Sequence, residues 1–332
     1  MRSVSMRSGP EFDRIRSVIG AIGSRESPDV LLGPGDDAAV IQAGSEESIV
    51  VSSDLSVEHV HFRREWLTWD AIGFRAVASA LSDLAAMGAR PIGALLSVAV
   101  PPELDLRTLD EIASGMGACL REHETSLLGG DLSRSPGPVV IDVTVLGAAR
   151  HPVGRDGARD GDELWVTGRL GGAALAASAW AGDLEPEAAT RRAFERPKPR
   201  LREARLLCDR AEVHAMIDLS DGLAGDAEHI AAASGVCLLM ETENVPLHRA
   251  LEGWSDPAAA LALAVGGGED YELLLAVAPG SAADARRLLS SEMSVDLTQV
   301  GRVTEGRGVR WVGGEGSDVD VPTGFDHFGG GA

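Results

Sequence analysis

Apolar residues along this chain recur at two spacings, which predict helices and strands in alternation. From Phe12 to Ile22 and from Trp69 to Met87 they return every three or four residues, as on one face of a helix, and Gly88 is placed to end the second helix. Short apolar runs bounded by Gly, Pro, Ser or Asp indicate strands. The predicted strands lie at 38–41, 48–53, 92–100, 126–128, 139–146, 163–167, 215–217, 236–240, 271–276 and 300–303. Further helices are predicted at 106–123, at 170–181, after residue 200 and from Asp221 onward.

The length and the alternation of elements predict a two-domain protein of the α/β class, in its α+β form. A chain of 332 residues exceeds what one hydrophobic core usually serves. Between Ala149 and Gly161 the sequence is rich in Arg, Asp and Gly and shows no periodicity, which is typical of a connection between domains. We therefore place the boundary near residue 150, with domains over 1–150 and 151–332.

The charge and the hydropathy argue against several kinds of protein. A formal net charge of −21 leaves no basic stripe for a phosphate backbone, which argues against nucleic acid as a partner. No apolar run approaches the length of a membrane span, and the first ten residues lack the apolar segment of a signal peptide. We therefore expect a cytoplasmic protein without a membrane partner. Its three cysteines are far apart and lack CxxC spacing, so we expect buried thiols.

Aspartates beside Gly and Ser contrast with a single lysine, Lys198. Carboxylates in such settings leave room for a hard cation and its waters, whereas one lysine cannot neutralise the charges of several phosphates. The pattern predicts magnesium ions that bind a phosphorylated substrate. Taken one at a time, each aspartate is more simply explained as a turn former or a helix cap. The set comprises Asp36, Asp54, Asp83, Asp131, Asp218 and Asp221, while the neighbouring Asp37 is expected to be structural.

The expected places of these aspartates in the elements differ. Asp54 and Asp218 are predicted at the ends of strands, and Asp131 directly after one. Asp83 falls in the last turns of a helix, where a negative charge opposes the helix dipole, so a functional role is favoured. Asp221 can cap the next helix, but Asp218 three residues earlier offers a second carboxylate nearby.

Several well-known catalytic motifs are missing from the sequence. A Walker A loop and a protein-kinase lysine both need a lysine in a setting that Lys198, between two prolines, does not provide. There is no HExxH metalloprotease motif and no GxSxG nucleophile elbow. If the protein binds ATP, backbone amides, arginine and bridging metal ions must therefore hold the triphosphate.

Two further places carry candidate binding residues. Three glycines precede Glu269 and Asp270, so the backbone there can approach a ligand closely, although a plain loop fits as well. The adjacent Tyr271 is the only tyrosine, and packing is as compatible with it as binding. For His61, a structural and a functional role stay equally open.

Seven ordered motifs resemble those of the thiamine-monophosphate kinase family, in the superfamily of aminoimidazole ribonucleotide synthetase and selenophosphate synthetase. The resemblance extends over nearly the whole chain. The motifs are Gly35-Asp36-Asp37-Ala38-Ala39, Ser52-Ser53-Asp54 with His61-Phe62, Leu81-Ser82-Asp83-Leu84-Ala85-Ala86-Met87-Gly88-Ala89, Gly129-Gly130-Asp131, Ile217-Asp218-Leu219-Ser220-Asp221-Gly222-Leu223, Gly267-Gly268-Glu269-Asp270-Tyr271-Glu272-Leu273 and Gly324-Phe325-Asp326-His327-Phe328.

This resemblance implies the two-domain fold of aminoimidazole ribonucleotide synthetase and a homodimer formed through the N-terminal domains, near which ATP binds. It implies ATP- and Mg²⁺-dependent transfer of the γ-phosphoryl group to thiamine monophosphate, giving thiamine diphosphate. By similarity, the metal-site residues are Asp36, Ser52, Ser53, Asp54, Asp83, Asp131, Asp218 and Asp221. The implied nucleotide contacts are Gly130, Asp131, Arg155 and Ser220, and the implied thiamine phosphate contacts are His61, Glu269 and Phe325. The C-terminal domain would complete both ligand sites.

The residues suit this chemistry. A phosphate monoester has a second pKa of about 6, so the attacking oxygen is mostly ionised and needs no general base. The obstacle is repulsion between two polyanions, which several Mg²⁺ ions held by carboxylates would lower. We therefore predict no catalytic side chain in the acid–base sense. The thiazolium cation would suit an acidic or aromatic wall at Glu269 and Phe325.

Three departures from the family pattern bear on the site. Ser53 stands where threonine is usual, Leu132-Ser133 follows Gly-Gly-Asp where Thr-Thr or Thr-Ser is common, and His59 replaces a glycine. A hydroxyl survives at Ser53 and Ser133. His59 bears on the shape of the loop that leads to His61.

Other classes of protein compete with this interpretation. A selenophosphate synthetase or a hydrogenase-maturation protein calls for a reactive cysteine near one terminus, and the segment from Phe328 to Ala332 has none. Aminoimidazole ribonucleotide synthetase lacks the pattern that ends in Phe328. A regulator that binds metal or nucleotide without turnover would keep the acidic sites, and an assay for thiamine diphosphate separates it from a kinase.

Overall fold

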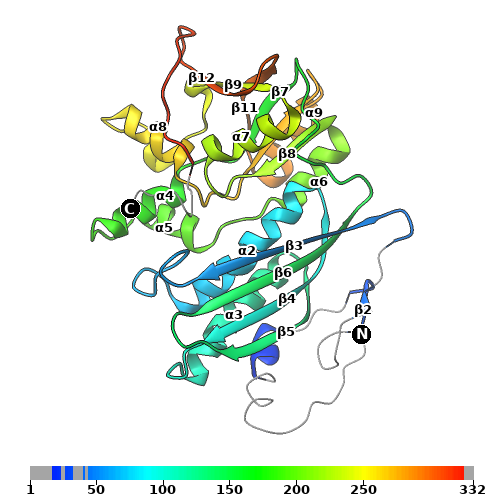
Figure 1. Ribbon diagram of the computed structural model, residues 1–332, viewed down its shortest axis with the longest axis vertical. Coiled ribbons are helices and arrows are strands. Elements are labelled where there is room, and N and C mark those ends of the chain that lie inside the picture. The colour runs from blue at the N-terminus through cyan, green and yellow to red at the C-terminus, as the bar shows by residue number, and fades with distance from the viewer. Residues whose placement is uncertain (1–16, 24–26, 33–39, 42–43, 325–332) are drawn as a thin grey trace. The chain divides into compact units, whose positions relative to one another are not determined.

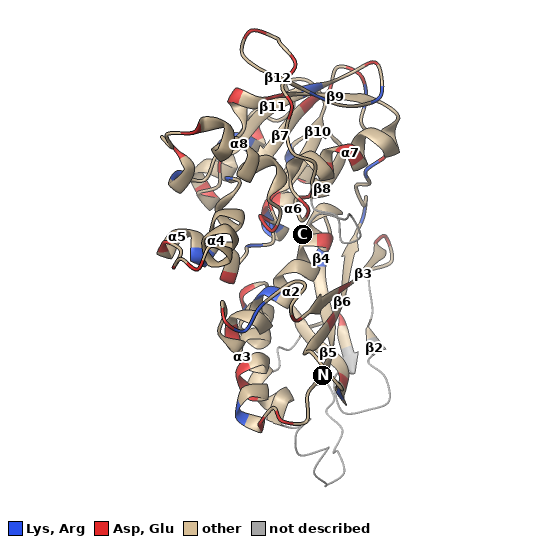
Figure 2. Ribbon diagram, turned by 60° about the vertical axis from the view of Figure 1, so that its left-hand side comes forward, with Lys and Arg blue, Asp and Glu red and all other residues tan. Residues whose placement is uncertain are grey.

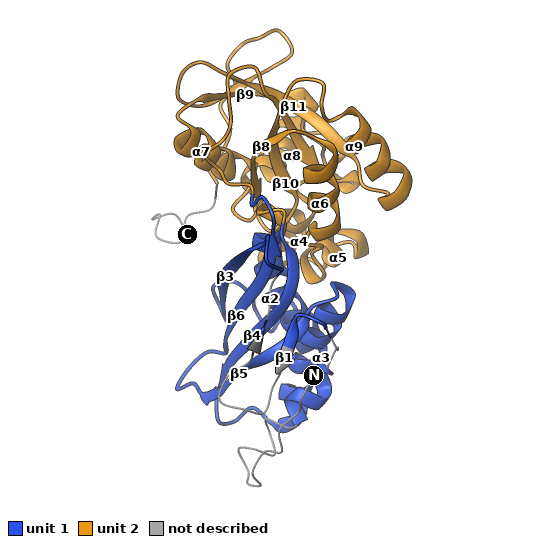
Figure 3. Ribbon diagram, turned by 90° about the vertical axis from the view of Figure 1, so that its right-hand side faces the viewer, with its two compact units in different colours: residues 1–84, 89–152 blue, residues 85–88, 153–332 orange. Residues whose placement is uncertain are grey.

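The computed structural model describes residues 17–23, 27–32, 40–41 and 44–324. The predicted site residues Asp36 and Phe325, and the neighbouring Asp37, lie outside the described residues. The chain divides into unit 1, with residues 1–84 and 89–152, and unit 2, with residues 85–88 and 153–332 (Figure 3). Each unit has its own sheet, and each is described by itself.

Unit 1 contains a four-stranded sheet with helices on one of its faces (Figure 1). In sheet order, its strands are β3 (Ser48–Val57), β6 (Val140–Ala149), β4 (Arg90–Val100) and β5 (Ser126–Arg134). Only β4 and β5 run parallel to each other. The helices are α2 (Trp69–Ala86) and α3 (Leu106–Glu122), and a separate pair of short strands is formed by β1 (Val30–Leu32) and β2 (Val40–Ile41). Residues 17–22 are also helical.

Alternation along the strands gives this sheet two different faces. In β6, Ile141, Val143 and Val145 are fully buried, while the residues between them are half-exposed. Successive side chains of a strand point to opposite faces, so the buried set faces the helices. On the edge strand β3 the exposed set includes Val51 and Leu55. The second face of the sheet, which we call the open face, therefore carries exposed apolar side chains.

Unit 2 contains a six-stranded sheet in which all pairs but one are antiparallel. In sheet order, its strands are β12 (Gly308–Val312), β9 (Cys237–Glu241), β11 (Leu297–Thr304), β7 (Glu163–Thr167), β10 (Leu273–Val277) and β8 (Val213–Asp218). Its α-helices are α4 (Gly172–Ala181), α5 (Ala188–Glu195), α6 (Leu201–Arg210), α7 (Leu223–Ser234), α8 (Pro257–Gly266) and α9 (Ala283–Leu288). Short 3₁₀ turns η1 (Thr242–Asn244) and η2 (Arg249–Leu251) and a π-helical turn η3 (Leu289–Met293) complete it. Strand β10 lies between β7 and β8 and is buried along its whole length, which explains its unbroken apolar sequence.

The α/β class of the α+β form is confirmed, and most predicted elements occur within a few residues of their predicted bounds. Three details of the prediction were wrong. Strand β3 continues to Val57, so Asp54 lies inside the strand rather than at its end. Strand β5 continues to Arg134 through Asp131. Helix α7 begins at Leu223 with Gly222 as its N-cap, so Asp221 neither starts nor caps it.

Strand β5 runs past its glycines because one of them allows close pairing with β4. A Cβ on Gly130 would lie 1.8 Å from the carbonyl oxygen of Leu96, so no other residue fits at that distance. The parallel ladder then continues from Gly130 to Arg134. The sequence predicts that strand β5 ends before Gly129 and Gly130. In the structure, the glycine at 130 is what allows the strand to continue.

Helices α2 and α3 also approach closely at glycines. A Cβ on Gly73 would lie 2.0 Å from the carbonyl oxygen of Ile112, and a Cβ on Gly115 would lie 1.9 Å from that of Asp70. Both contacts are with backbone, which cannot rotate away as a side chain can. This spacing fixes α2, and with it Asp83, against the rest of unit 1.

We predict that Gly115→Ala destabilises the protein, although alanine favours a helix. The added methyl group must displace backbone of α2, and overpacking of this kind costs about 1–3 kcal/mol. The free energy of unfolding in urea measures the effect. The matched control is Gly137→Ala, whose Cβ would have nothing within 4 Å. Equal stability of both variants would contradict the close helix contact.

Candidate functional site

Strand β3 and helix α2 bring two predicted metal-site residues into contact. The Ser52 hydroxyl donates a hydrogen bond of 2.5 Å to Oδ2 of Asp83. Asp54 follows Ser52 by two residues and is also half-buried, so it lies on the same, helix-facing side of the sheet. The sequence predicts an anion near the end of α2, where the helix dipole opposes it. In the structure, the hydroxyl of Ser52 donates a hydrogen bond to this carboxylate of Asp83.

Ser53 lies on the opposite side of β3 from these residues. Its hydroxyl donates to Oδ1 of Asp142 at 2.9 Å and lies 3.0 Å from Oγ1 of Thr144. Both partners belong to β6 and face the open side of the sheet. The side chains of Ser52 and Ser53 therefore cannot bind one ligand on the same face of the sheet. Asp142 is an acidic neighbour of Ser53 that the sequence pattern does not single out.

Asp131 is exposed on β5, at the other edge of the sheet from β3. The register pairs Asp131 with Ser97, Ser97 with Asp142, and Asp142 with Leu55. Directly paired residues share a face, so Asp131 lies on the open face. Three strand spacings of about 4.8 Å place its strand roughly 14 Å from that of Asp54. Within one copy of unit 1, Asp131 does not join Ser52, Asp54 and Asp83.

In the turn after β3, a backbone hydrogen bond sets the tautomer of a neutral His61 ring. The backbone N–H of Val57 donates to Nδ1 of His61 at 3.0 Å, which in a neutral ring leaves the proton on Nε2. His59 has φ of 69°, a left-handed conformation that glycine adopts without strain. His59 thus has a glycine-like backbone, and its N–H donates to the carbonyl oxygen of Phe62 at 2.7 Å.

In unit 2, the segment between β8 and α7 gathers three aspartates. Asp218 ends β8 and is buried, and Asp221 is half-buried. The backbone N–H of Asp221 donates to Oδ2 of Asp226 at 3.1 Å, from the first turn of α7. Burial, and then the charges of Asp218 and Asp221, raise the pKa of Asp226 from 3.8 to about 8. The three carboxylates therefore repel one another at the N-terminal end of a helix.

Their donor chemistry fits Mg²⁺, although no finished cage is present. Among the described residues, no group of three or more His, Cys, Asp or Glu side chains is arranged to hold a metal ion. Mg²⁺ keeps several waters and usually binds one or two carboxylates together with phosphate oxygens, so it does not need such a cage. A divalent cation at Asp218 and Asp221 would also offset the repulsion that Asp226 experiences. The predicted metal residues of unit 2 thus lie close together.

Of the two predicted nucleotide contacts of unit 2, Ser220 lies within this acidic segment and Arg155 lies near it. Arg155 is exposed, and its charge is near enough to lower the pKa of Asp226 against the larger opposing effects. Ser220 lies between Asp218 and Asp221, and its carbonyl oxygen accepts the backbone N–H of Glu269 at 2.8 Å. Acidic residues outnumber basic ones in this chain, 51 to 30, and Figure 2 shows both kinds on the two units.

The loop that carries Glu269 is joined to the rest of unit 2 by its other acidic residues. Both carboxylate oxygens of Asp270 accept the N–H of Gly171 at the start of α4, at 3.0 and 2.9 Å. Loss of water around this carboxyl raises the pKa of Asp270 well above its usual range, although the Gly171 N–H opposes the shift. Oε2 of Glu272 accepts from Thr167 at 2.7 Å and from Nε of Arg200 at 2.6 Å. Of the three acids, Asp270 and Glu272 thus have structural partners.

The segment before Phe325 passes along α7 to the acidic residues. A Cβ on Gly324 would lie 2.7 Å from Cα of Gly225 and 2.9 Å from the carbonyl oxygen of Asp221. Gly324 therefore lies directly against the start of α7. Phe325 itself is outside the described residues, but the residue that precedes it is placed beside Asp221.

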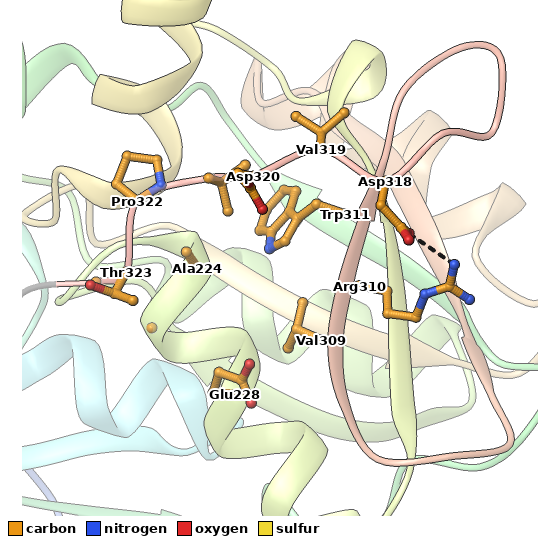
Figure 4. A pocket seen from close by; sticks show the side chains of 13 residues that line it. Ala224, Glu228, Val309, Arg310, Trp311, Asp318, Val319, Asp320, Pro322 and Thr323 are labelled. Carbon is orange, nitrogen blue, oxygen red and sulfur yellow. Dashed lines mark hydrogen bonds and ion pairs between the residues drawn. The ribbon is translucent and has the colours of Figure 1, made fainter.

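A pocket of about 360 Å³ extends from this point between α7, β12 and residues 318–324 (Figure 4). Glu228, Asp320 and the indole of Trp311 line it. Its arginine, Arg310, is paired with Asp318 at 2.8 Å. The lining is therefore acidic and aromatic, which suits a cation better than a phosphate group.

The comparison with known proteins identifies the family of the chain. Residues 35–149 match the N-terminal domain of AIR synthase related proteins, and residues 159–313 match the C-terminal domain. A thiamine-monophosphate kinase of Rhodopirellula baltica is 36% identical over 315 residues, which are 92% of this chain and 93% of that protein. The enzyme of Salmonella typhimurium is 32% identical over 96% of this chain and 95% of its own. The chain belongs to the thiamine-monophosphate kinase family.

Solved structures of this family share the fold. The crystal structure of thiamine-monophosphate kinase from Stenotrophomonas maltophilia has a TM-score of 0.79 at 35% identity and covers 92% of this chain and 96% of its own. AaThiL complexed with AMPPCP and TMP has a TM-score of 0.74 at 30% identity, over 98% of this chain and 100% of its own. The hydrogenase maturation protein HypE, at 19% identity and a TM-score of 0.74, shows the fold alone. The family and fold predicted from the seven motifs are confirmed.

Family membership does not by itself single out three residues that the geometry adds. Asp226 couples to Asp218 and Asp221, Asp142 bonds to Ser53, and Tyr271 bonds to Glu269. In the sequence, Asp142 stands between Ile141 and Val143 with no glycine or serine beside it, whereas Asp226 directly follows Gly225. The Gly225-Asp226 pair, in the first turn after Ser220-Asp221-Gly222, was therefore an available signal for Asp226. No helix in the described part of the chain could cross a membrane.

We predict that Asp226 makes the folded protein less stable as the pH rises. Between the ordinary pKa of 3.8 and about 8, the folded chain keeps a proton on Asp226 that the unfolded chain has lost. The unfolded state then binds fewer protons, so the contribution of Asp226 to stability falls over that window. Asp226→Asn can still accept from Asp221 and should flatten the slope of the thermal midpoint between about pH 5 and about pH 8.

Magnesium provides the control for this prediction. A cation near the three carboxylates favours their ionised forms, so saturating Mg²⁺ should flatten the wild-type slope and raise its thermal midpoint most at the higher pH. Parallel slopes for the wild type and Asp226→Asn without metal would contradict the coupling.

Proposed function

We propose that this protein transfers the γ-phosphoryl group of ATP to thiamine monophosphate in a Mg²⁺-dependent reaction that gives thiamine diphosphate. The observation that carries the proposal is the set of aspartates at the end of β8, Asp218 and Asp221, beside Arg155 and Ser220 in a chain of the thiamine-monophosphate kinase family. Relatives that match over more than nine-tenths of the chain have this name, and one solved relative is complexed with AMPPCP and TMP.

The chemistry needs position and charge rather than an acid or a base. The phosphate of the acceptor has a second pKa of about 6 and is mostly ionised at neutral pH, so its oxygen can attack directly. When bound, Mg²⁺ supplies charge neutralisation and alignment for the two polyanions. The protein's part is to place carboxylates where the cations bind and Arg155 where it meets the triphosphate.

The proposed roles follow the predicted sets. We assign the metal ions to Asp36, Ser52, Ser53, Asp54, Asp83, Asp131, Asp218 and Asp221, and the nucleotide to Gly130, Asp131, Arg155 and Ser220. We assign thiamine phosphate to His61, Glu269 and Phe325. Because the hydroxyl of Ser53 faces the open side of the sheet, we propose that any contact of Ser53 with the metal of Asp54 uses its backbone carbonyl oxygen.

We further propose a homodimer formed through unit 1. The open face exposes Val51 by 58% and Leu55 by 49%, and neighbouring exposed apolar side chains of this kind mark interaction surfaces. Asp131 lies on that face, at the opposite edge from Asp54. A second copy packed on the open face would cover the apolar residues. Because Asp54 faces the helices from the edge strand β3, we propose that the partner copy's Asp131 reaches it around that edge.

The partners proposed are therefore ATP, thiamine monophosphate, Mg²⁺ and a second copy of the chain. A cytoplasmic location and the absence of nucleic-acid and membrane partners remain predictions from the acidic, moderately apolar sequence.

The first prediction of the proposed function concerns turnover. Purified protein with ATP, Mg²⁺ and thiamine monophosphate should form thiamine diphosphate, detected by chromatography. Asp54→Asn should lower kcat by about 100-fold or more, because a lost metal contact removes charge stabilisation in the transition state. Asp110→Asn, a carboxylate of α3 that instead bonds to Ser17, is the matched control and should keep near wild-type rates. No product above a no-enzyme control would refute the kinase and favour a non-catalytic regulator.

A second prediction concerns a metal site formed by two copies of the chain. If Asp54 and Asp131 of different copies bind one metal, Asp54→Asn and Asp131→Asn are each inactive, but half of randomly mixed dimers carry one intact site. Mixing the two variants after mild dissociation should then restore about one quarter of wild-type activity. A site built within one copy predicts no recovery.

The open face supplies the control for this mixing experiment. Adding Val51→Glu to both variants should abolish the recovery and halve the mass in size exclusion with light scattering, because a charge then lies in the buried interface. Leu106→Glu, which is 46% exposed at the start of α3, should leave both unchanged.

A further inference from the structure

The backbone around Glu269 is held in an unusual conformation. Glu269 has φ of 65° and Tyr271 has φ of 51°, both in the left-handed region that residues other than glycine seldom occupy. Two hydrogen bonds to the segment after β8 stabilise this shape. The N–H of Glu269 donates to Ser220 and the N–H of Tyr271 donates to Leu219, each at 2.8 Å. Strain of this kind persists only where surrounding contacts hold it.

The same loop aims its acidic side chains in different directions. Asp270 is bonded to Gly171 at the start of α4, and Glu272 is paired with Arg200. These two carboxylates are therefore occupied by structural partners. Glu269 is the acid of the loop that the proposed function assigns to thiamine phosphate.

Tyr271 bonds directly to Glu269. Its ring is buried, with 8% of the residue exposed, and its hydroxyl donates to Oε2 of Glu269 at 2.9 Å. Packing alone would be served equally by phenylalanine, so the hydroxyl requires another explanation. A hydrogen bond to one oxygen restricts the rotation of the carboxylate about χ3, which otherwise has broad minima.

We propose that Tyr271 is a positioning residue, whose hydroxyl fixes the Glu269 carboxylate in the orientation that receives the cationic ring of thiamine monophosphate. The proposal rests on the proposed function, because it deepens the role of the substrate site. The left-handed residues on either side of Asp270 place the Tyr271 hydroxyl within reach of Glu269. Tyr271 does not touch the reacting phosphates, so it acts on substrate binding rather than on phosphoryl transfer.

Tyr271→Phe removes only the hydroxyl and tests this role. Losing one hydrogen bond to a carboxylate should raise KM for thiamine monophosphate about ten-fold, while kcat and KM for ATP change by less than about two-fold. In the background of Glu269→Gln, the same substitution should add little, because the group that it orients is already changed. Equal effects of Tyr271→Phe in both backgrounds would overturn the proposal.

Thr190→Val is the control for a general loss of stability. The Thr190 hydroxyl is buried and donates to the carbonyl oxygen of Glu187 at 2.9 Å, near the start of α5. Its loss should lower the thermal midpoint without changing either KM. A purely structural role for the Tyr271 hydroxyl predicts that the two variants behave alike, with an unchanged KM for thiamine monophosphate.

An NMR measurement tests the contact between Tyr271 and Glu269 without enzyme turnover. Tyr271 is the only tyrosine of the chain, so ring-labelled tyrosine gives a single Cζ signal in NMR. The signal should move in Glu269→Gln and move again when thiamine monophosphate is added to the wild type. If the wild type makes no thiamine diphosphate, the proposed function falls, and the response of this signal to thiamine monophosphate still tests the positioning of Glu269. An unmoved signal in both experiments would overturn the proposal itself.

Discussion

Repulsion among carboxylates is the constraint on which the organisation of unit 2 depends. Asp218, Asp221 and Asp226 lie near enough for burial and their mutual charges to raise the pKa of Asp226 to about 8. A raised pKa favours a protonated Asp226, and the N-terminal end of α7 offers partial positive charge to the cluster. A bound cation would favour the ionised carboxylates in the same way.

The rest of unit 2 holds this unfavourable arrangement in place. The loop around Glu269 is fastened to the segment after β8 by backbone hydrogen bonds, and to α4 and Arg200 through its own acids. Close contacts at glycine place Gly324 against the start of α7. These hydrogen bonds and glycine contacts are short, and several involve the backbone. The candidate ligand-binding residues of unit 2 therefore have little freedom to move apart. Such order reduces the reorganisation that a phosphoryl-transfer site would otherwise need.

In unit 1 the alternation of strand residues separates groups that are neighbours in the sequence. Ser52 meets Asp83 on the helix side, whereas Ser53 meets Asp142 on the open face. The same open face carries Asp131 and the exposed apolar side chains of β3. In the proposed homodimer, a second copy would bury this apolar surface and would add the Asp131 of its own sheet.

The sequence by itself determined the family, the α+β class and most elements, because apolar periodicity and seven ordered motifs are local patterns. It also determined the chemistry, since many aspartates with one lysine leave metal ions as the main source of positive charge. Tertiary structure alone decided which acids act together. Asp226 joins the cluster through a helix turn, Asp270 turns to α4, and Tyr271 reaches Glu269 through two left-handed residues. It also decided that Asp54 and Asp131 lie on opposite faces, because strand length and register depend on pairing with distant strands that no local window contains.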